Sequence, residues 1–221
     1  MTESIKSVIV IGATGLVGRE LLKQLNVLQS CKNITAIVRR EDAELKKLAK
    51  VQQFIISDFL LLNDEDVSGY SHAFSCLGTT LKKAGSKQNF YNVDYEINAH
   101  FADLLQASST HYLLISAMGA NPQSRFFYNK VKGEVEQHIR SLTLARVSIL
   151  RPSLLLGERQ EQRGLEDAAQ KLYQKLSHLV PDSFKYKPVT AEQVADTLVS
   201  AAQNQTTPFE IYDNLRILNF K

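Results

Sequence analysis

The sequence opens on a hydrophobic run that ends in three evenly spaced glycines, V-I-V-I-G-A-T-G-L-V-G over residues 8–18. The run is β-branched and nearly continuous, which predicts a strand buried on both faces. Gly12 would permit a tight turn into the following helix, Gly15 would let backbone amides approach a phosphate, and Gly18 would let helix and strand pack closely. The bend therefore predicts a pyrophosphate site at a helix N-terminus, with a purely structural turn as the alternative.

Short hydrophobic runs alternate with longer amphipathic segments through the first 150 residues. This alternation predicts an α/β fold, a doubly wound parallel sheet with helices on both faces and right-handed crossovers. No proline- or glycine-rich linker divides the chain, so residues 1–221 are expected to form one domain. The expected strands are 5–11, 34–38, 51–56, 73–77, 111–115 and 147–150, and the expected helices are 15–28, 41–50, 93–107 and 128–141.

The alternation weakens after residue 152, which we interpret as a small C-terminal substrate-side lobe at about 153–190. Residues 165–179 are expected to be helical. A further helix is expected over 190–203, where Thr190 and Gln193 occupy the two positions of a capping box. Residues 209–212 and 216–220 are expected to be short strands.

Composition restricts the class of protein. The chain has 221 residues, 44% of them hydrophobic, and a net charge of +3, which excludes a disordered chain and gives no support to nucleic-acid binding. Two cysteines indicate a reducing compartment, and five histidines show no metal-ligand spacing, so no metal is expected. No apolar stretch is long enough for a signal peptide or a membrane span. We therefore expect a cytoplasmic protein.

Two arginines follow the second expected strand and bear on the choice of dinucleotide. NAD-binding proteins commonly place an acidic residue here, where it contacts the ribose hydroxyls. Arg39 and Arg40 stand there instead, and a guanidinium group binds a 2′-phosphate in bidentate fashion. The sequence therefore favours NADP over NAD. The alternative is a solvated basic turn, since Glu41 and Asp42 follow at once.

The ends of the third and fourth strands supply further candidate contacts. Asp58 follows the third strand, where it either meets the adenine amino group or caps a turn. Cys76, Leu77 and Gly78 end the fourth strand, beside the crevice outside the carboxyl ends of the strands. We interpret Cys76 as a packing residue, because no activating base is apparent. Cofactor contacts are also expected from the rest of the bend, at Ala13, Thr14, Leu16 and Val17.

A tyrosine and a lysine four residues apart, Tyr128 and Lys132, share one face of an expected helix. Ser116 ends the fifth strand, and Asn92 precedes the helix before it. This set suits hydride transfer to a carbonyl, because the resulting alkoxide must take a proton. The Lys132 ammonium would favour the tyrosinate form of Tyr128 and bind the cofactor ribose. Ser116 would orient the substrate oxygen, and Asn92 would anchor a relay water.

Five stretches carry a family resemblance: IGATGLVG, SCLGTT, YNVDYEINAHFADLL, LISAMGANPQSRFFYNKVKGEVE and SILRPSLLLGERQE. The chain resembles the short-chain dehydrogenase/reductase superfamily, and more narrowly the atypical, extended-like branch typified by the Tat-interacting oxidoreductase family. The resemblance implies an NADP-binding Rossmann fold. By position it assigns phosphate contacts to Gly12, Gly15, Gly18 and Arg39, and catalytic or nicotinamide-side roles to Ser116, Tyr128, Lys132, Asn92 and Pro152.

Three functions are compatible with these residues. We favour an NADP-dependent oxidoreductase that transfers hydride to or from a small carbonyl or alcohol substrate. The second is an NADPH-binding regulator that contacts a protein partner and requires no turnover. The third is a nucleotide-sugar-type epimerase or dehydratase. The chain is compatible with a monomer or a homodimer, and the substrate is left open.

Overall fold

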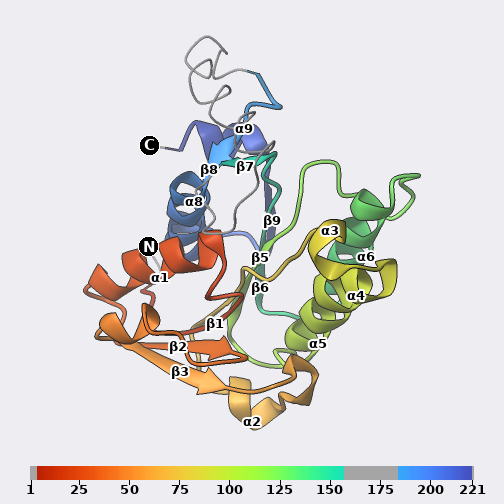
Figure 1. Cartoon of the computed structure of the whole chain (residues 1–221). Coiled ribbons are helices and arrows are strands. Elements are labelled where there is room, and N and C mark those ends of the chain that lie inside the picture. The colour runs from red at the N-terminus through yellow and green to blue at the C-terminus, as the bar shows by residue number, and fades with distance from the viewer. Residues whose placement is uncertain (1–3, 157–183, 221) are drawn as a thin grey trace.

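A computed structural model describes residues 4–156 and 184–220 of the chain (Figure 1). Seven parallel strands form one sheet in the order β3-β2-β1-β4-β5-β6-β9. They are β1 (Ser7–Ile11), β2 (Asn33–Val38), β3 (Val51–Ile55), β4 (His72–Ser75), β5 (His111–Ile115), β6 (Arg146–Leu150) and β9 (Phe209–Tyr212). The strand order reverses between β1 and β4, which is where such folds open a ligand crevice. The predicted doubly wound parallel sheet is confirmed.

Helices cover both faces of this sheet, as Figure 1 shows. α1 (Leu16–Val27) and α8 (Ala191–Asn204) pack on one face, and α5 (Ile97–Asp103) and α6 (Phe127–Ser141) pack on the other. β1 serves both layers, because Val8 and Val10 join the core under α1 while Ile9 and Ile11 join the core under α6. A strand buried on both faces needs apolar residues at every position, which explains the continuous hydrophobic run.

The other described elements are short. The helical ones are η1 (Leu45–Lys47), η2 (Phe59–Leu61), α2 (Asp64–Val67), α3 (Leu81–Ala84), α4 (Lys87–Tyr91), the π-helical turn η3 (Asn92–Glu96) and α9 (Asn214–Leu218). β7 (Leu155–Leu156) and β8 (Val189–Thr190) form a separate two-stranded parallel sheet. The helix expected over 165–179, and most of the lobe expected at about 153–190, lie outside the described residues.

Two expected helices differ from the structure for local reasons. Within 41–50 only η1 is helical, because the Asp42 carboxylate accepts hydrogen bonds from the backbone amides of Glu44 and Leu45 and so holds a turn. The helix expected over 93–107 is split into η3 and α5. There the Asn98 side-chain amide donates to the backbone carbonyl of Val93 at 3.0 Å, a bond that accompanies the wider π turn.

The C-terminal end holds one confirmed and one wrong expectation. α8 begins where predicted, and both hydrogen bonds of the capping box between Thr190 and Gln193 are present. The strand expected over 216–220 is instead helix α9. Asp213 accepts a hydrogen bond from the backbone amide of Arg216 at 2.9 Å, which caps and begins that helix. Within the described ranges, no helix is long and apolar enough to cross a bilayer.

Because the strands are parallel, their carboxyl ends meet at one edge of the sheet, which we call the carboxyl edge. The glycine bend follows β1 there, and Arg39 and Arg40 follow β2. Ser116 and Arg151 stand directly after β5 and β6. Residues from distant parts of the sequence are thus brought to a single edge. The opposite edge, where His72 and His111 begin β4 and β5, is called the amino edge below.

Candidate functional site

The bend after β1 requires glycine at two positions. Gly12 has φ +75°, and a Cβ built on it would lie 2.4 Å from the backbone carbon of Cys76. A Cβ on Gly18 would lie 2.2 Å from the carbonyl oxygen of Gly12. The first glycine lets β1 turn sharply beside β4, and the second lets α1 approach the bend. Both contacts are with backbone atoms, which cannot move aside for a side chain.

The helix that follows the bend has an open N-terminus. Its N-cap residue, Gly15, has no side chain to accept hydrogen bonds from the first amides of α1, and the first turn carries no acidic residue. The side chains of Ala13 and Val17 are buried in the core, so they would meet a ligand through backbone atoms. The end of α1 therefore presents amide donors and a positive dipole to an anion.

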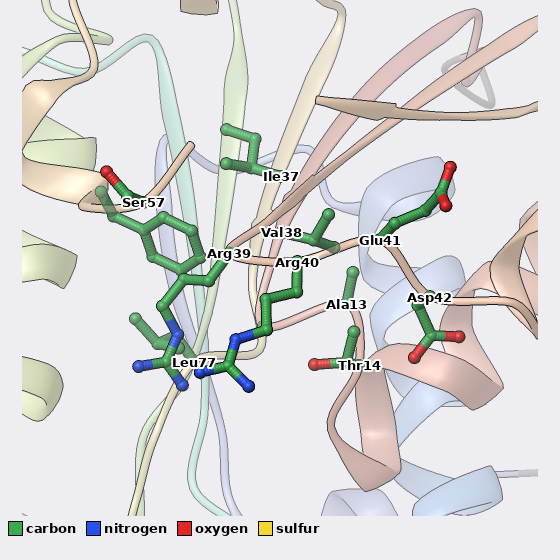
Figure 2. A pocket seen from close by; sticks show the side chains of 12 residues that line it. Ala13, Thr14, Ile37, Val38, Arg39, Arg40, Glu41, Asp42, Ser57 and Leu77 are labelled. Carbon is green, nitrogen blue, oxygen red and sulfur yellow. The ribbon is translucent and has the colours of Figure 1, made fainter. Parts of the chain in front are cut away.

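A cavity of about 630 Å³ opens beside the bend, in the range of sites for drug-sized ligands (Figure 2). Its walls come from the bend and from the segments that follow β2, β3 and β4. The lining residues are Gly12, Ala13, Thr14, Ile37, Val38, Arg39, Arg40, Glu41, Asp42, Ser57, Phe59 and Leu77. The cavity thus collects Gly12, Ala13, Thr14, Arg39, Arg40 and Leu77 of the predicted contacts, and its lining does not include Gly15, Leu16, Val17, Gly18, Asp58, Cys76, Gly78, Tyr128, Lys132 or Pro152.

The charges around this cavity are unevenly paired. Figure 2 shows the side chains of Arg39 and Arg40 pointing to the same side of the cavity. Within the described part of the chain, neither guanidinium group has an ion-pair partner. By contrast, Glu41 pairs with Lys46 at 2.6 Å, and Asp42 pairs with Arg19 at 2.5 Å. The cavity therefore presents two uncompensated positive charges.

Two predicted contacts have structural roles. The Asp58 carboxylate accepts a hydrogen bond from the backbone amide of Leu60 at 3.0 Å and caps η2, while Ser57 and Phe59 on either side of it line the cavity. Burial raises the pKa of the Cys76 thiol to about 12. A thiol that resists ionisation in this way is a poor nucleophile, in agreement with the packing interpretation.

A buried ion pair ties α6 to η3. The Lys132 ammonium lies 2.7 Å from Oδ1 of Asp94, and both side chains are almost fully buried. The second oxygen of Asp94 accepts a hydrogen bond from the backbone amide of Thr79. Burial alone would lower the pKa of Lys132, but the charges of Asp94, Tyr128 and Glu136 outweigh it and raise that pKa. Lys132 therefore stays protonated at neutral pH.

Gly78 lies against this ion pair. A Cβ on Gly78 would lie 3.2 Å from Oδ1 of Asp94 and 3.5 Å from Nζ of Lys132. The absence of a side chain at Gly78 leaves room for the pair at the carboxyl edge. Asn92, expected from the sequence to anchor a relay water, has a buried side-chain oxygen without a hydrogen bond to the described residues.

A second polar cluster joins the segment after β5, helix α6 and the segment after β6. The Ser116 hydroxyl donates a hydrogen bond to the Glu136 carboxylate, which also accepts from the Arg151 guanidinium, with Nε at 3.0 Å. Pro152 follows Arg151, and its carbonyl accepts from the backbone amide of Met118 at 2.8 Å. Because its proton is committed to Glu136, Ser116 presents its lone pairs to any ligand.

Tyr128 stands at the start of α6. Its ring packs on the buried ring of Phe90, with centroids 5.7 Å apart, and about a third of its surface is exposed. Tyr128, Lys132 and Glu136 follow one another at four-residue intervals, so they share one face of α6. Sequence reasoning missed Asp94, Glu136 and the Arg151 side chain. Continuation of the four-residue spacing could have indicated Glu136.

These features fit a bound dinucleotide. The open end of α1 suits a pyrophosphate, and the two unpaired guanidinium groups suit a further phosphate at the end of β2. Tyr128 and Lys132 stand across the switch point from those groups, at the same edge of the sheet. The residues present thus fit the group that the resemblance implies.

Comparison with curated proteins gives relatives over most of the chain. Protein FMP52-1, mitochondrial, of Scheffersomyces stipitis is 36% identical over 199 residues, which cover 89% of this chain and 88% of that protein. Protein HTATIP2 of Rattus norvegicus is 34% identical over 219 residues, which cover 97% of this chain and 88% of that protein. The second relative bears out the resemblance to the Tat-interacting oxidoreductase family.

These relatives also correct one expectation. FMP52 proteins of several yeasts, including Debaryomyces hansenii and Candida albicans, match this chain with 32–36% identity, and their names call them mitochondrial. They point away from a cytoplasmic location, so the location expected from the sequence is wrong. The expectation rested on the lack of a long apolar stretch, which says nothing about a particular compartment.

Solved structures and family models agree on the fold. An oxidoreductase of the short-chain dehydrogenase/reductase family from Burkholderia thailandensis superposes with a TM-score of 0.67 at 13% identity, over 97% of this chain and 93% of that one. The WbmF enzyme of Bordetella bronchiseptica in complex with NAD+ gives 0.66 at 16% identity, over 95% and 72%. A model of NAD(P)H-binding proteins matches residues 12–205. The chain therefore belongs to the NAD(P)H-binding family of Rossmann-fold proteins.

Proposed function

We propose that this chain is an NADP-dependent oxidoreductase of the atypical short-chain dehydrogenase/reductase type, acting on a small carbonyl or alcohol. The observation that carries the proposal is the pair of unpaired guanidinium groups, Arg39 and Arg40, in a cavity that begins at the glycine bend. A 2′-phosphate is the group that distinguishes NADP from NAD, and it would meet both arginines there. When bound, the nicotinamide supplies or accepts the hydride.

The chain's own residues then transfer the proton and orient the substrate. The Tyr128 hydroxyl exchanges a proton with the substrate oxygen, and it is exposed enough to reach one. Lys132, held protonated beside Asp94 and one helical turn after Tyr128, would bind the cofactor ribose. Ser116 accepts a hydrogen bond from a substrate hydroxyl, since its own proton goes to Glu136. The buried Asn92 oxygen is available to a relay water.

The coenzyme half of the proposal is tested by calorimetric titration with NADPH and NADH. We expect the protein to bind NADPH more tightly than NADH. In Arg39→Gln we expect most of this difference in affinity to be lost, a change on the order of tenfold. Arg140→Gln is a matched control. Arg140 lies in the last turn of α6, away from the cavity, and its guanidinium group stacks on the ring of Phe209. Tighter binding of NADH by the unaltered protein would contradict the proposal.

A coenzyme-dependent regulator is the second candidate, and one observation favours it. The buried carboxylate of Asp94 already binds Lys132, and that of Glu136 already binds Ser116. Side chains fixed in this way suit a site that holds a ligand in place. A screen of aldehydes and ketones for NADPH oxidation separates the two candidates. Turnover that requires Tyr128 supports the oxidoreductase. NADPH binding without any carbonyl-dependent oxidation supports the regulator.

A further inference from the structure

An ion pair joins the start of α1 to the loop after β2. The Arg19 guanidinium meets both oxygens of the Asp42 carboxylate, at 3.2 and 2.5 Å, in a two-pronged geometry. Arg19 also donates through Nε to the backbone carbonyl of Thr14, at 3.1 Å. The same side chain thus connects the glycine bend to the loop that carries Arg39 and Arg40.

Asp42 is held firmly on the cavity wall. Its backbone amide and carbonyl are both bound by the side-chain amide of Gln53, each at 2.8 Å. Its carboxylate also accepts from the backbone amides of Glu44 and Leu45, at 3.0 and 3.2 Å. These bonds hold the carboxylate in place, and Figure 2 shows it on the side of the cavity toward Thr14.

The other acidic residue of the loop is in a different situation. Figure 2 shows Glu41 turned away from both guanidinium groups. Glu41 pairs with Lys46, and both of those side chains are more than half exposed, so solvent screens that charge. Only about a sixth of the Asp42 side chain is exposed. Asp42 is thus the carboxylate that would act on an anion in this cavity.

We propose that Arg19 determines coenzyme selectivity by neutralising Asp42, so that the loop after β2 accepts the 2′-phosphate instead of repelling it. The inference rests on the proposed function and deepens it. A carboxylate beside the end of β2 is the arrangement that favours the ribose hydroxyls of NAD. The bond to Arg19, with help from the loop amides, lowers the pKa of Asp42, so the carboxylate stays ionised and its charge must be cancelled by a partner.

The test compares NADPH and NADH affinities across a double-mutant cycle of Arg19→Met, Asp42→Asn and their combination. Arg19→Met should leave the Asp42 charge exposed to the 2′-phosphate and lower the NADPH preference by about tenfold. Asp42→Asn keeps an oxygen for the amides of Glu44 and Leu45, and it should keep the NADPH preference or increase it. The double variant should return to within about twofold of the unaltered protein.

Controls separate charge from structure. Lys23→Met removes a neighbouring ion pair of α1, between Lys23 and Glu20, and should leave the preference unchanged. Circular dichroism and thermal unfolding without coenzyme check that each variant is folded. An Arg19→Met variant with an unchanged preference would overturn the inference. A double variant that stays as unselective as Arg19→Met would also overturn it, because the pair would then act by holding the loop.

Failure of the inference is distinct from failure of the proposed function. If the unaltered protein prefers NADH or binds neither coenzyme, the proposed NADP dependence fails before the cycle is read. If the unaltered protein prefers NADPH and Arg39→Gln reduces that preference, the function stands. Only the response of Arg19→Met and the double variant then decides the role of the ion pair between Arg19 and Asp42.

Discussion

At the carboxyl edge of the sheet, two buried carboxylates meet cations in ion pairs, whereas at the amino edge two buried histidines are neutral and joined by hydrogen bonds. Lys132 with Asp94, and Arg151 with Glu136, represent the first edge. His72 and His111, whose rings lie 5.5 Å apart, represent the second. The two edges of one sheet thus bury polar side chains in different ways, as ion pairs at one and as neutral histidines at the other.

The amino edge is arranged to keep its histidines uncharged. Nε2 of His72 lies 3.1 Å from the carbonyl oxygen of Ala202, and Nε2 of His111 lies 2.8 Å from the Ser148 hydroxyl. The Ser148 hydroxyl in turn donates to the side-chain oxygen of Gln205. Burial lowers the pKa of His72 to about 4 and, with the neighbouring ring of His72, lowers that of His111 to about 3. These residues stabilise the fold while neutral.

This contrast between the two edges indicates which property a substitution at each edge should change. Charged groups beside an open cavity can act on a ligand. Solvent or a bound anion offsets part of the free-energy cost of burying these charges. Neutral groups sealed under helices can act only on stability. We therefore expect variants at the carboxyl edge to change coenzyme binding and turnover, and variants at the amino edge to change unfolding.

The largest expected effect is loss of turnover in Tyr128→Phe. Removing the hydroxyl removes the proton donor, which contributes about 10²–10⁴-fold to such reactions. NADPH affinity should change little, because the ring remains packed on Phe90. Steady-state rates of NADPH oxidation, with calorimetry for binding, measure both quantities. Tyr70→Phe is the matched control, since the Tyr70 hydroxyl bonds Thr35 near the amino edge. Turnover that survives in Tyr128→Phe would refute the assigned mechanism.

The next effect is loss of stability in acid. In the unfolded chain both histidines protonate near pH 6.5, but in the folded chain only near pH 4 and pH 3. Between these values the unfolded state binds more protons, so stability falls as pH falls from about 6.5 toward 4. We expect the Tm from circular dichroism to drop by on the order of 10 °C over this range.

The double variant His72→Gln/His111→Gln tests that assignment. It removes both titrating rings while leaving amide groups that can bond Ala202 and Ser148. Its Tm at neutral pH should be lower, but its decline with acid should be much shallower. An equally steep decline in this variant would assign the acid sensitivity to other groups. Coenzyme affinity should be unchanged at neutral pH.

Asp94→Asn tests whether a variant at the carboxyl edge also changes stability. Its carboxylate belongs to the carboxyl edge yet is fully buried, and its loss removes the ion-pair partner of the Lys132 ammonium. We expect a destabilisation of about 3 kcal/mol, seen as a Tm lower by on the order of 10 °C. Glu20→Gln removes an exposed pair on α1 and should change stability by less than about 0.5 kcal/mol. Equal Tm values for the two variants would show that the pair between Lys132 and Asp94 is solvated.

The smallest effect concerns Asp58, for which the sequence left two roles open. Asp58→Ala removes the cap of η2 and should cost about 1 kcal/mol without changing NADPH affinity. Chemical denaturation and calorimetric titration measure the two quantities. Asn63→Ala removes the similar cap of α2 and serves as the comparison. A clear loss of NADPH affinity in Asp58→Ala alone would restore the adenine contact.

The fold was largely predictable because its signals are local. The continuous apolar run of β1, the glycine bend and the capping box at Thr190 each act within a few residues, and each is where the sequence indicates. The strand expected over 216–220 is wrong because apolar residues there suggested a strand, while the cap at Asp213 favours a helix. A capping signal outweighs a short apolar run.

The pairings within the candidate site were not predictable. Asp94 lies two positions after Asn92 in the π turn η3, and its pairing with Lys132 joins that turn to a separate helix. Ser116, Glu136 and Arg151 lie on three separate elements and meet only after the sheet has formed. Such contacts depend on tertiary packing, which spacing along the sequence does not determine. Spacing alone could pair Tyr128 with Lys132, because both lie on one face of α6.

We infer that the glycine bend and the loop after β2 together bind NADPH at the carboxyl edge. A crystal structure of the protein grown with excess NADPH tests this most directly. We expect the pyrophosphate at the N-terminus of α1 and the 2′-phosphate between Arg39 and Arg40, with the nicotinamide next to the Tyr128 hydroxyl. A coenzyme bound elsewhere on the chain, or a nicotinamide remote from Tyr128, would contradict it.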